Sequence, residues 1–374
     1  MNLTRMLKII LCTITVTLFL SGCWDSVDIE DKTIDTIISY DKNDHGYVFY
    51  GQIISFASNQ QNKGGGGPSQ GLQSLVVKSE GKTFTEAREK LDAQVSRQMF
   101  LGAAQVAIIG ERAAKDGIEE YLKRVRSGFD YRKTLDVVIT NENIEDILNY
   151  KDILEPSSGF AISSTIRAAV SNGKSYRFMM ADMLEKMSSP NDCYLLHMIT
   201  LNSGITLDGY AVMNHGKMKG TTPPDEGDGI IILKVKKPAL DMIVPTSHGD
   251  VTVRVRKLKE KITPLLSEGK IEFNIHLEFN AQVLYTSQKV AFTQQISQEV
   301  NSNLDGQIKA LIEKTINTSQ RFESDYLDFY DSLRIKYPQE VKKMDWEKEF
   351  PQADFQVSVS SVLAVTNTVD YYIE

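Results

Sequence analysis

The sequence predicts a multidomain protein of mixed α/β and α+β class. We expect an N-terminal mixed sheet with helices, followed by a C-terminal antiparallel sheet packed by long helices. Residues 75–150 alternate short apolar strands with amphipathic helices, as strands covered on both faces do. Residues 250–374 place long strands of alternating polarity before long helices, which is typical of an α+β domain. The predicted divisions are an N-terminal α/β region at 23–200, a middle β-rich region at 201–249 and a C-terminal domain at 250–374.

The first 22 residues have the pattern of a secretory signal. Arg5 and Lys8 precede an apolar stretch of about 12 residues, which is shorter than the roughly 20 needed to cross a bilayer. Leu20-Ser21-Gly22-Cys23 then resembles the bacterial lipoprotein signal, in which a thiol forms the thioether to diacylglycerol. We expect residues 1–22 to be removed as a lipoprotein signal peptide and Cys23 to be lipidated. An ordinary signal peptide and an uncleaved anchor are the alternatives.

Composition excludes some classes of function. The chain has 42 Lys and Arg against 49 Asp and Glu, and removal of the signal peptide makes it more acidic. An acidic protein is a poor candidate for sequence-independent nucleic-acid binding, which depends on basic patches. Of the three cysteines, Cys12 leaves with the signal peptide and Cys23 carries the lipid, so Cys193 has no disulfide partner.

The first part of the mature chain begins with a hairpin at 34–56. The glycine run at 64–67 predicts a surface loop, because it lacks the Gly-Lys-Ser/Thr of a phosphate loop. Thr83 and Glu86 form a capping box, and a helix with one apolar stripe follows it. The stripe consists of Phe84, Ala87, Leu91, Val95 and Met99. Further strands are expected at 75–77, 104–109 and 135–139, a helix over Ile118, Leu122 and Val125, and a short helix capped by Asn141.

Residues 150–235 give a less regular pattern. Helices are expected at 156–172 and 176–187, whereas the apolar stretch at 193–201 is ambiguous. The second helix carries Met179, Met180, Met183 and Met187. Such a cluster serves either core packing or a plastic binding surface, and core packing is favoured. A hairpin at 206–220 and a buried strand at 229–235 complete this part.

The C-terminal third has the clearest periodicity. Strands of alternating polarity are expected at 251–256, 271–285 and 355–365, and pairing of Arg254 and Arg256 with Glu272 or Glu278 is plausible. A long amphipathic helix carries Ile296, Val300, Leu304, Ile308, Leu311, Ile312 and Ile316. A second helix, or a kinked continuation ended by Pro338, carries Phe322, Tyr326, Phe329, Tyr330, Leu333 and Tyr337.

The sequence contains no recognised catalytic or metal-binding motif, and no cofactor is expected. The histidines at 45, 197, 215, 248 and 276 have no metal-ligand spacing. We expect His276 on a solvated strand face, His215 and His248 in turns, and His197 packed. Asp325 and Asp328 could form a carboxylate pair, but a solvated helix face is the favoured interpretation. The sequence therefore favours a protein that is not an enzyme.

Four separated stretches carry a family resemblance. They are Cys23-Trp24-Asp25-Ser26-Val27-Asp28-Ile29, residues 104–132 with Asp130-Tyr131-Arg132, the pair Gly209–Met213 and Lys217–Gly220, and residues 320–350 with Ser324-Asp325, Tyr337-Pro338, Trp346 and Phe350. Together they resemble the Ger(x)C family, the C subunits of bacterial spore nutrient germinant receptors. The chain differs from the family pattern at Gln105, Val341 and the glycine run.

The resemblance implies a lipid-anchored, non-catalytic subunit on the outer face of the spore inner membrane. It implies two integral membrane partners, an A-type and a B-type subunit, that start germination with it in response to amino acids or sugars. Phe322, Tyr326 and Tyr330 are expected mostly in the core, with part of this aromatic stripe contacting a partner. A solute-binding lipoprotein of a transporter and an envelope-anchored enzyme are the other candidates. A solute-binding lipoprotein usually has two similar α/β lobes, which this chain lacks.

Overall fold

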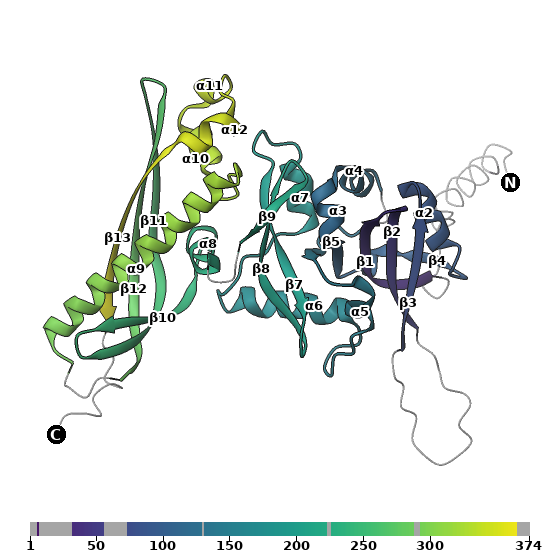
Figure 1. The fold of residues 1–374 in the computed structure, drawn as a ribbon, viewed down its shortest axis with the longest axis horizontal. Coiled ribbons are helices and arrows are strands. Elements are labelled where there is room, and N and C mark those ends of the chain that lie inside the picture. Colours follow the sequence, from purple (N-terminus) through teal and green to yellow (C-terminus); the bar gives the residue numbers. More distant parts are fainter. Residues whose placement is uncertain are drawn as a thin grey trace, which may run out of the picture.

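The computed structural model describes residues 32–55, 73–128, 131–222, 226–287 and 292–364, together with Met6. A nine-stranded sheet and a four-stranded sheet lie toward opposite ends of the long axis (Figure 1). This mixed, multidomain α+β architecture confirms the predicted fold class. The predicted signal peptide, Cys23 and the glycine run at 64–67 lie outside the described residues.

The first sheet has the strand order β3-β2-β1-β5-β6-β7-β8-β9, and β4 also pairs with β1. Strands β1, β5, β6 and β7 are parallel, and antiparallel neighbours flank them on both sides. The bounds are β1 (Lys32–Asn43), β2 (Gly46–Ser55), β3 (Gln73–Gly81), β4 (Gln98–Phe100), β5 (Val106–Gly110), β6 (Asp136–Thr140), β7 (Cys193–Leu201), β8 (Ile205–Asn214) and β9 (Lys217–Thr222).

Helices cover both faces of this sheet, which explains why β5 and β6 are buried along their whole length. One face packs against α2 (Phe84–Asp92), α3 (Glu111–Asp116), α4 (Glu119–Ser127) and α7 (Met180–Lys186). The other packs against α5 (Ile144–Asn149) and α6 (Ser158–Ser171). A 3-10 turn, Leu101–Ala103, precedes β5.

The structure confirms the predicted hairpins, β1–β2 and β8–β9, and the N-cap of α2, where Thr83 accepts a hydrogen bond from the Glu86 N–H. Helix α2 is shorter than predicted, because it ends at Asp92 and Met99 reaches the same core from β4. The cap of α5 is Asn143, not Asn141, since its side chain accepts from the Glu145 N–H at 3.0 Å.

The predicted helices in 150–200 are present as α6 and α7, although α7 begins only at Met180. Met180 and Met183 are fully buried in the core, which confirms packing rather than surface display for these two. The ambiguous stretch at 193–201 forms strand β7.

Residues 229–235 do not form the predicted strand, because residues 229–234 belong to helix α8 (Gly227–Lys234) and Val235 caps its end. Three consecutive isoleucines, residues 230–232, are buried in this helix. A short apolar run fits a buried helix as well as a buried strand, so periodicity could not separate the two. Helix α8 packs against α9 (Gln294–Arg321) and lies between the two sheets (Figure 1).

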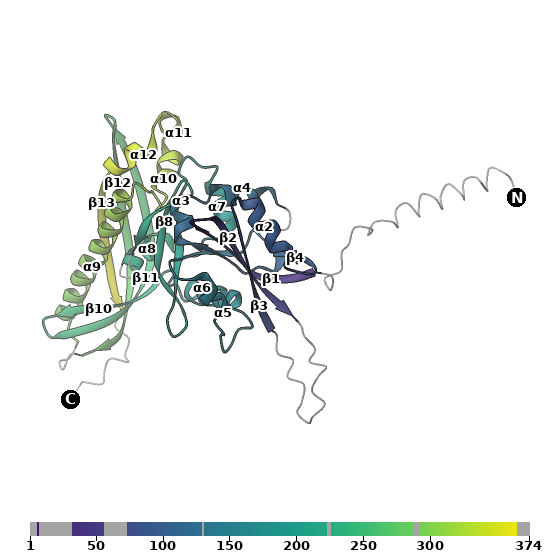
Figure 2. The same cartoon turned by 45° about the vertical axis from the view of Figure 1, so that its right-hand side comes forward.

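The second sheet has the order β10-β11-β12-β13, and α9 crosses one of its faces (Figure 2). Its strands are β10 (Ala239–Thr246), β11 (Gly249–Ser267), β12 (Lys270–Thr286) and β13 (Asp354–Ala364). The prediction of an antiparallel sheet is wrong at one pair, since β13 runs parallel to β12. The predicted middle region at 201–249 is divided, with β8 and β9 in the first sheet and β10 in the second.

The predicted pairing of Arg254 and Arg256 with Glu272 or Glu278 is also wrong. Arg254 makes two contacts with Asp241 of β10, at 2.7 and 2.9 Å, and Glu278 pairs with Lys259 at 2.8 Å. The register places Arg254 opposite Gln282, which lies further along β12 than either expected partner. Strand β10 carries the missing partner, and the sequence analysis did not predict that strand.

The aromatic stretch after α9 is not one helix. It contains a turn followed by α10 (Phe329–Lys336), α11 (Pro338–Val341), α12 (Trp346–Glu349) and a 3-10 turn, Phe350–Gln352. Glu323 and Asp328 have positive φ angles of 49° and 64°, which an α-helix cannot contain. Pro338 opens α11 rather than only ending the preceding helix.

The contact between α8 and α9 predicts that substitution of two glycines of α8 by alanine will have very different effects on stability. A Cβ on Gly229 would lie 2.0 Å from Thr315 Oγ1 and 2.9 Å from the Leu311 carbonyl oxygen, whereas a Cβ on Gly227 meets nothing within 4 Å. We expect Gly229→Ala to lower the free energy of unfolding by about 1–3 kcal/mol through overpacking. The control, Gly227→Ala, should leave it unchanged or raise it by up to about 1 kcal/mol. Urea unfolding of both variants checks this, and equal midpoints would contradict the close helix contact.

Candidate functional site

The carboxyl group of Asp325 lies where the turn after α9 meets the first sheet, and it accepts several hydrogen bonds. Asp325 is buried, and its carboxylate accepts hydrogen bonds from the backbone N–H groups of Phe329 and Tyr330, at 3.0 and 2.8 Å. The Trp346 indole N–H donates to it at 3.1 Å. The Asn191 amide, from the loop before β7, donates to the carboxylate at 3.2 Å and to the Asp325 carbonyl at 3.0 Å. Asp325 therefore satisfies the first turn of α10 and joins it to the first sheet.

Burial has a large effect on this carboxyl group. It raises the pKa of Asp325 from 3.8 to about 7, against the hydrogen bonds from Tyr330 and Phe329, which lower it. The nearby charge of Asp328 also raises the pKa, and that of Lys186 lowers it. The protonation state of Asp325 is therefore sensitive to pH near neutrality.

Asp328 lies three residues further on, in a left-handed conformation, and takes part in a second contact between elements. Its carboxylate pairs with Lys186 of α7 at 2.6 Å and with Lys234 of α8. Burial acts to raise the pKa of Asp328, but the two ammonium groups hold it below its usual value. The favoured interpretation of Asp325 and Asp328 as a solvated helix face is thus wrong. Each carboxylate contacts side chains or backbone groups from several elements, so both serve to hold these elements together.

The β8–β9 hairpin is bound to the same turn. The Asn214 amide donates to the Glu323 carbonyl at 2.8 Å, and the Ser324 hydroxyl donates to the Met213 carbonyl at 3.1 Å. A Cβ on Gly220 would lie 2.5 Å from the Phe322 ring, so β9 approaches this ring too closely for a larger residue. We call this set of contacts around residues 322–328 the junction.

The three aromatic residues expected to reach a partner lie at or behind the junction. Tyr326 and Tyr330 are 1% and 6% exposed, and the Tyr326 hydroxyl donates to the Thr315 carbonyl at 3.3 Å. Phe322 is partly buried and packs against the core of the second sheet. Partner binding by these rings stays a prediction, which the burial of Tyr326 and Tyr330 disfavours.

The histidines lie where the sequence indicated. His276 is half-exposed on β12, near Ser358 and Glu278, and His215 and His248 lie in turns. His197 is buried beside Ser175 and Tyr176, and burial lowers its pKa to about 4, so it is neutral. Within the described ranges, no group of three or more potential ligands could hold a metal ion.

The lone thiol, Cys193, is buried, and burial raises its pKa to about 12. A thiol that stays protonated is a poor nucleophile and a poor metal ligand. Like His197 and Cys193, the two aspartates that the sequence analysis singled out thus lie in an unusual electrostatic environment. Asn191, Lys186 and Lys234, which complete that environment, were not recognised from the sequence.

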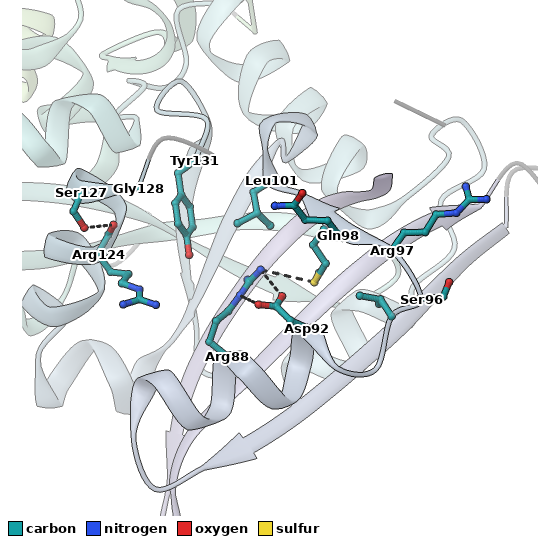
Figure 3. Close-up of a pocket in the computed structure, with 12 residues that line it drawn as sticks. Arg88, Asp92, Ser96, Arg97, Gln98, Leu101, Arg124, Ser127, Gly128 and Tyr131 are labelled. Atoms are coloured by element: carbon teal, nitrogen blue, oxygen red, sulfur yellow. Dashed lines mark hydrogen bonds and ion pairs between the residues drawn. The ribbon is translucent and has the colours of Figure 1, made fainter. Parts of the chain in front are cut away.

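A separate cavity of about 650 Å³ lies in the N-terminal part, between α2, β4 and α4 (Figure 3). Arg88, Arg97 and Arg124 line it with one carboxylate, Asp92. The rest of the lining consists of Ser96, Gln98, Ser127, Gly128 and Tyr131, together with the apolar residues Val95, Met99 and Leu101.

Where the structure describes the chain, no helix is long and apolar enough to span a membrane.

The junction yields a stability prediction for Asp325→Asn. Both oxygens of the Asp325 carboxyl group can accept hydrogen bonds, even when it is protonated. The amide keeps the shape but offers one acceptor oxygen, and its NH₂ group would face N–H donors. We expect the free energy of unfolding near pH 6 to fall by about 2–4 kcal/mol, because buried donors lose their acceptor. Asp331→Asn, which changes an exposed carboxylate of α10 paired with Arg334, should change it by less than about 0.5 kcal/mol. Urea unfolding followed by tryptophan fluorescence measures both, and equal effects would refute the role of Asp325.

The raised pKa of Asp325 gives a pH dependence of known sign. The folded state retains a proton that an unfolded chain, with a pKa of 3.8, has released. The stability contributed by this group is therefore complete below pH 3.8 and is lost as the pH rises through about 7. Between about pH 5 and 7, the advantage of the native chain over Asp325→Asn should shrink by on the order of 1 kcal/mol per pH unit. A difference that stays constant over this range would mean that Asp325 is ionised in the fold.

Comparison with known proteins adds the family. Residues 25–201 match the model of the spore germination protein N-terminal domain, and residues 208–365 match that of the spore germination B3/GerAC-like C-terminal domain. The first model ends with β7, the second begins within β8, and together they cover most of the chain.

Relatives in Bacillus subtilis match over nearly their whole length. Spore germination protein KC is 23% identical, over 95% of this chain and 96% of its own. Spore germination protein YndF is 21% identical, over 98% of each chain. The crystal structure of the GerBC protein shares the fold, with a TM-score of 0.54 at 17% identity over 87% of this chain and 96% of the other. The chain therefore belongs to the Ger(x)C family of spore germination proteins.

Proposed function

We propose that the chain is the lipid-anchored C subunit of a spore nutrient germinant receptor, held on the outer face of the spore inner membrane. The family match over nearly the whole chain carries the germination role. The sequence Leu20-Ser21-Gly22-Cys23 supports the anchor, through diacylglycerol on Cys23 and a further acyl chain such as palmitate. Two chains hold a protein on a membrane where one is marginal.

We also propose that the subunit acts by contact and not by turnover. The buried thiol, the neutral buried histidine and the structural use of Asp325 and Asp328 support this. The partners would be an A-type and a B-type integral membrane subunit. The alternative, a solute-binding lipoprotein, is disfavoured because the two sheets differ in size and strand order and do not form two similar lobes.

The anchor predicts a difference among the three cysteines. In sporulating cells, Cys23→Ala should abolish labelling of the protein with palmitate and leave the unprocessed precursor. Cys12→Ala and Cys193→Ala should keep both the label and the mature mass, because one cysteine lies in the signal peptide and the other is buried. Membrane-bound Cys23→Ala protein of mature mass would refute lipidation at Cys23.

The same cells test the partners. An affinity-tagged chain, extracted from spore inner membranes in mild detergent, should bring down two multi-span proteins in constant ratio, and the Cys23→Ala spores should respond poorly to nutrients. Recovery of a transporter permease instead, together with heat release on titration of a solute in calorimetry, would favour the solute-binding alternative.

A further inference from the structure

We propose that the cavity between α2, β4 and α4 binds the phosphate of an anionic phospholipid headgroup in the membrane to which the chain is anchored. The inference rests on the proposed lipid anchor, which would hold the cavity close to that membrane. Support comes in three parts, namely the charge of the cavity, its lining and its distance from Cys23.

The first part is an excess of positive charge. Arg88 lines the cavity, and Asp92 fixes its guanidinium through contacts of 3.2 and 2.8 Å (Figure 3). Arg124 enters from α4, and its guanidinium lies 5.9 Å from the centre of the Phe84 ring. Among the described residues, no carboxylate lies within ion-pair distance of Arg124. A guanidinium without a carboxylate partner, beside a second one held in place, suits the oxygens of a phosphate.

The second part is the lining around these charges. In Figure 3 the Tyr131 hydroxyl points toward the space between Arg88 and Arg124, whereas Arg97 points away from them. Met99 and Leu101 are buried beneath the cavity and give it an apolar floor. A phosphodiester with a glycerol backbone has the same division, with charged oxygens on one side and carbon on the other. A free inorganic phosphate would leave the apolar floor without a contact.

The third part is position. Lys32, the first residue of β1, pairs with Gln98 of β4, which lines the cavity. The chain from Cys23 to Lys32 spans at most about 30 Å even when fully extended, so an anchored protein cannot hold this end far from the bilayer. The cavity is basic although the chain as a whole has a formal net charge of −7. Basic groups near an anionic leaflet contribute about 1 kcal/mol each, within a Debye length of the surface.

The test titrates the full chain in dodecyl maltoside with three probes, and native mass spectrometry counts the bound molecules. The probes are dihexanoyl phosphatidylglycerol, dihexanoyl phosphatidylcholine and inorganic phosphate. We expect phosphatidylglycerol to bind at one site, and Arg124→Gln to weaken that binding by about tenfold or more, as the loss of a charge-assisted contact does. Lys123→Gln is the matched control, because Lys123 is the exposed neighbour on α4 and pairs with Glu119 outside the cavity.

Three results would overturn the proposal. They are phosphatidylcholine binding as tightly as phosphatidylglycerol, phosphate binding as tightly as the lipid, and equal effects of Arg124→Gln and Lys123→Gln. Arg124 is exposed, so its substitution should leave the thermal unfolding midpoint unchanged, which the same samples verify. The probes are short-chain lipids supplied in detergent, so the result does not depend on lipidation. Failure of the anchor would show in the cysteine variants, and failure of the headgroup site would show only here.

Discussion

The structure depends on one constraint, that both oxygens of the buried carboxyl group of Asp325 must accept hydrogen bonds. A buried charged or polar group without partners costs several kcal/mol, so its donors cannot move away independently. Those donors come from the first turn of α10, from Trp346 of α12 and from Asn191 before β7. The carboxylate thus fixes the small helices of the C-terminal part and ties them to the first sheet. The salt bridges of Asp328 with Lys186 and Lys234 add α7 and α8 to the same tie.

The junction joins the two sheets through direct contacts between their elements. Helix α8 leaves the first sheet and packs on α9, which is the helix that covers the second sheet. Figures 1 and 2 place the four-stranded sheet at the end of the molecule remote from β4. A tether at the β1–β4 end would therefore present the second sheet at a set distance from the anchor. That arrangement suits a subunit that works through contact with neighbours.

The sequence was sufficient for elements whose periodicity is local. The alternation along 271–285 gave β12, and the capping residues Thr83 and Glu86 gave the start of α2. It was insufficient where the deciding partner lies far along the chain. Residues 230–232 are buried in a helix that packs on α9, and β13 is parallel to β12 because a long crossover through α9 returns the chain to the same end of the sheet. Asp325 was recognised as a candidate residue, but the environment that raises its pKa includes Asn191, which is 134 residues away.

The proposed anchor and the proposed headgroup site together constrain orientation, which neither does alone. A lipid on Cys23 limits the distance of Lys32 from the membrane to at most about 30 Å, but it does not by itself determine how the body is oriented. An acidic body is repelled by an anionic leaflet, whereas a cavity with Arg88 and Arg124 is attracted to it. Repulsion of the acidic body and attraction of the basic cavity favour the same orientation, in which α2 and α4 face the lipid. Since the junction joins the second sheet to the first, that orientation would also determine which surfaces of the second sheet face the proposed membrane partners.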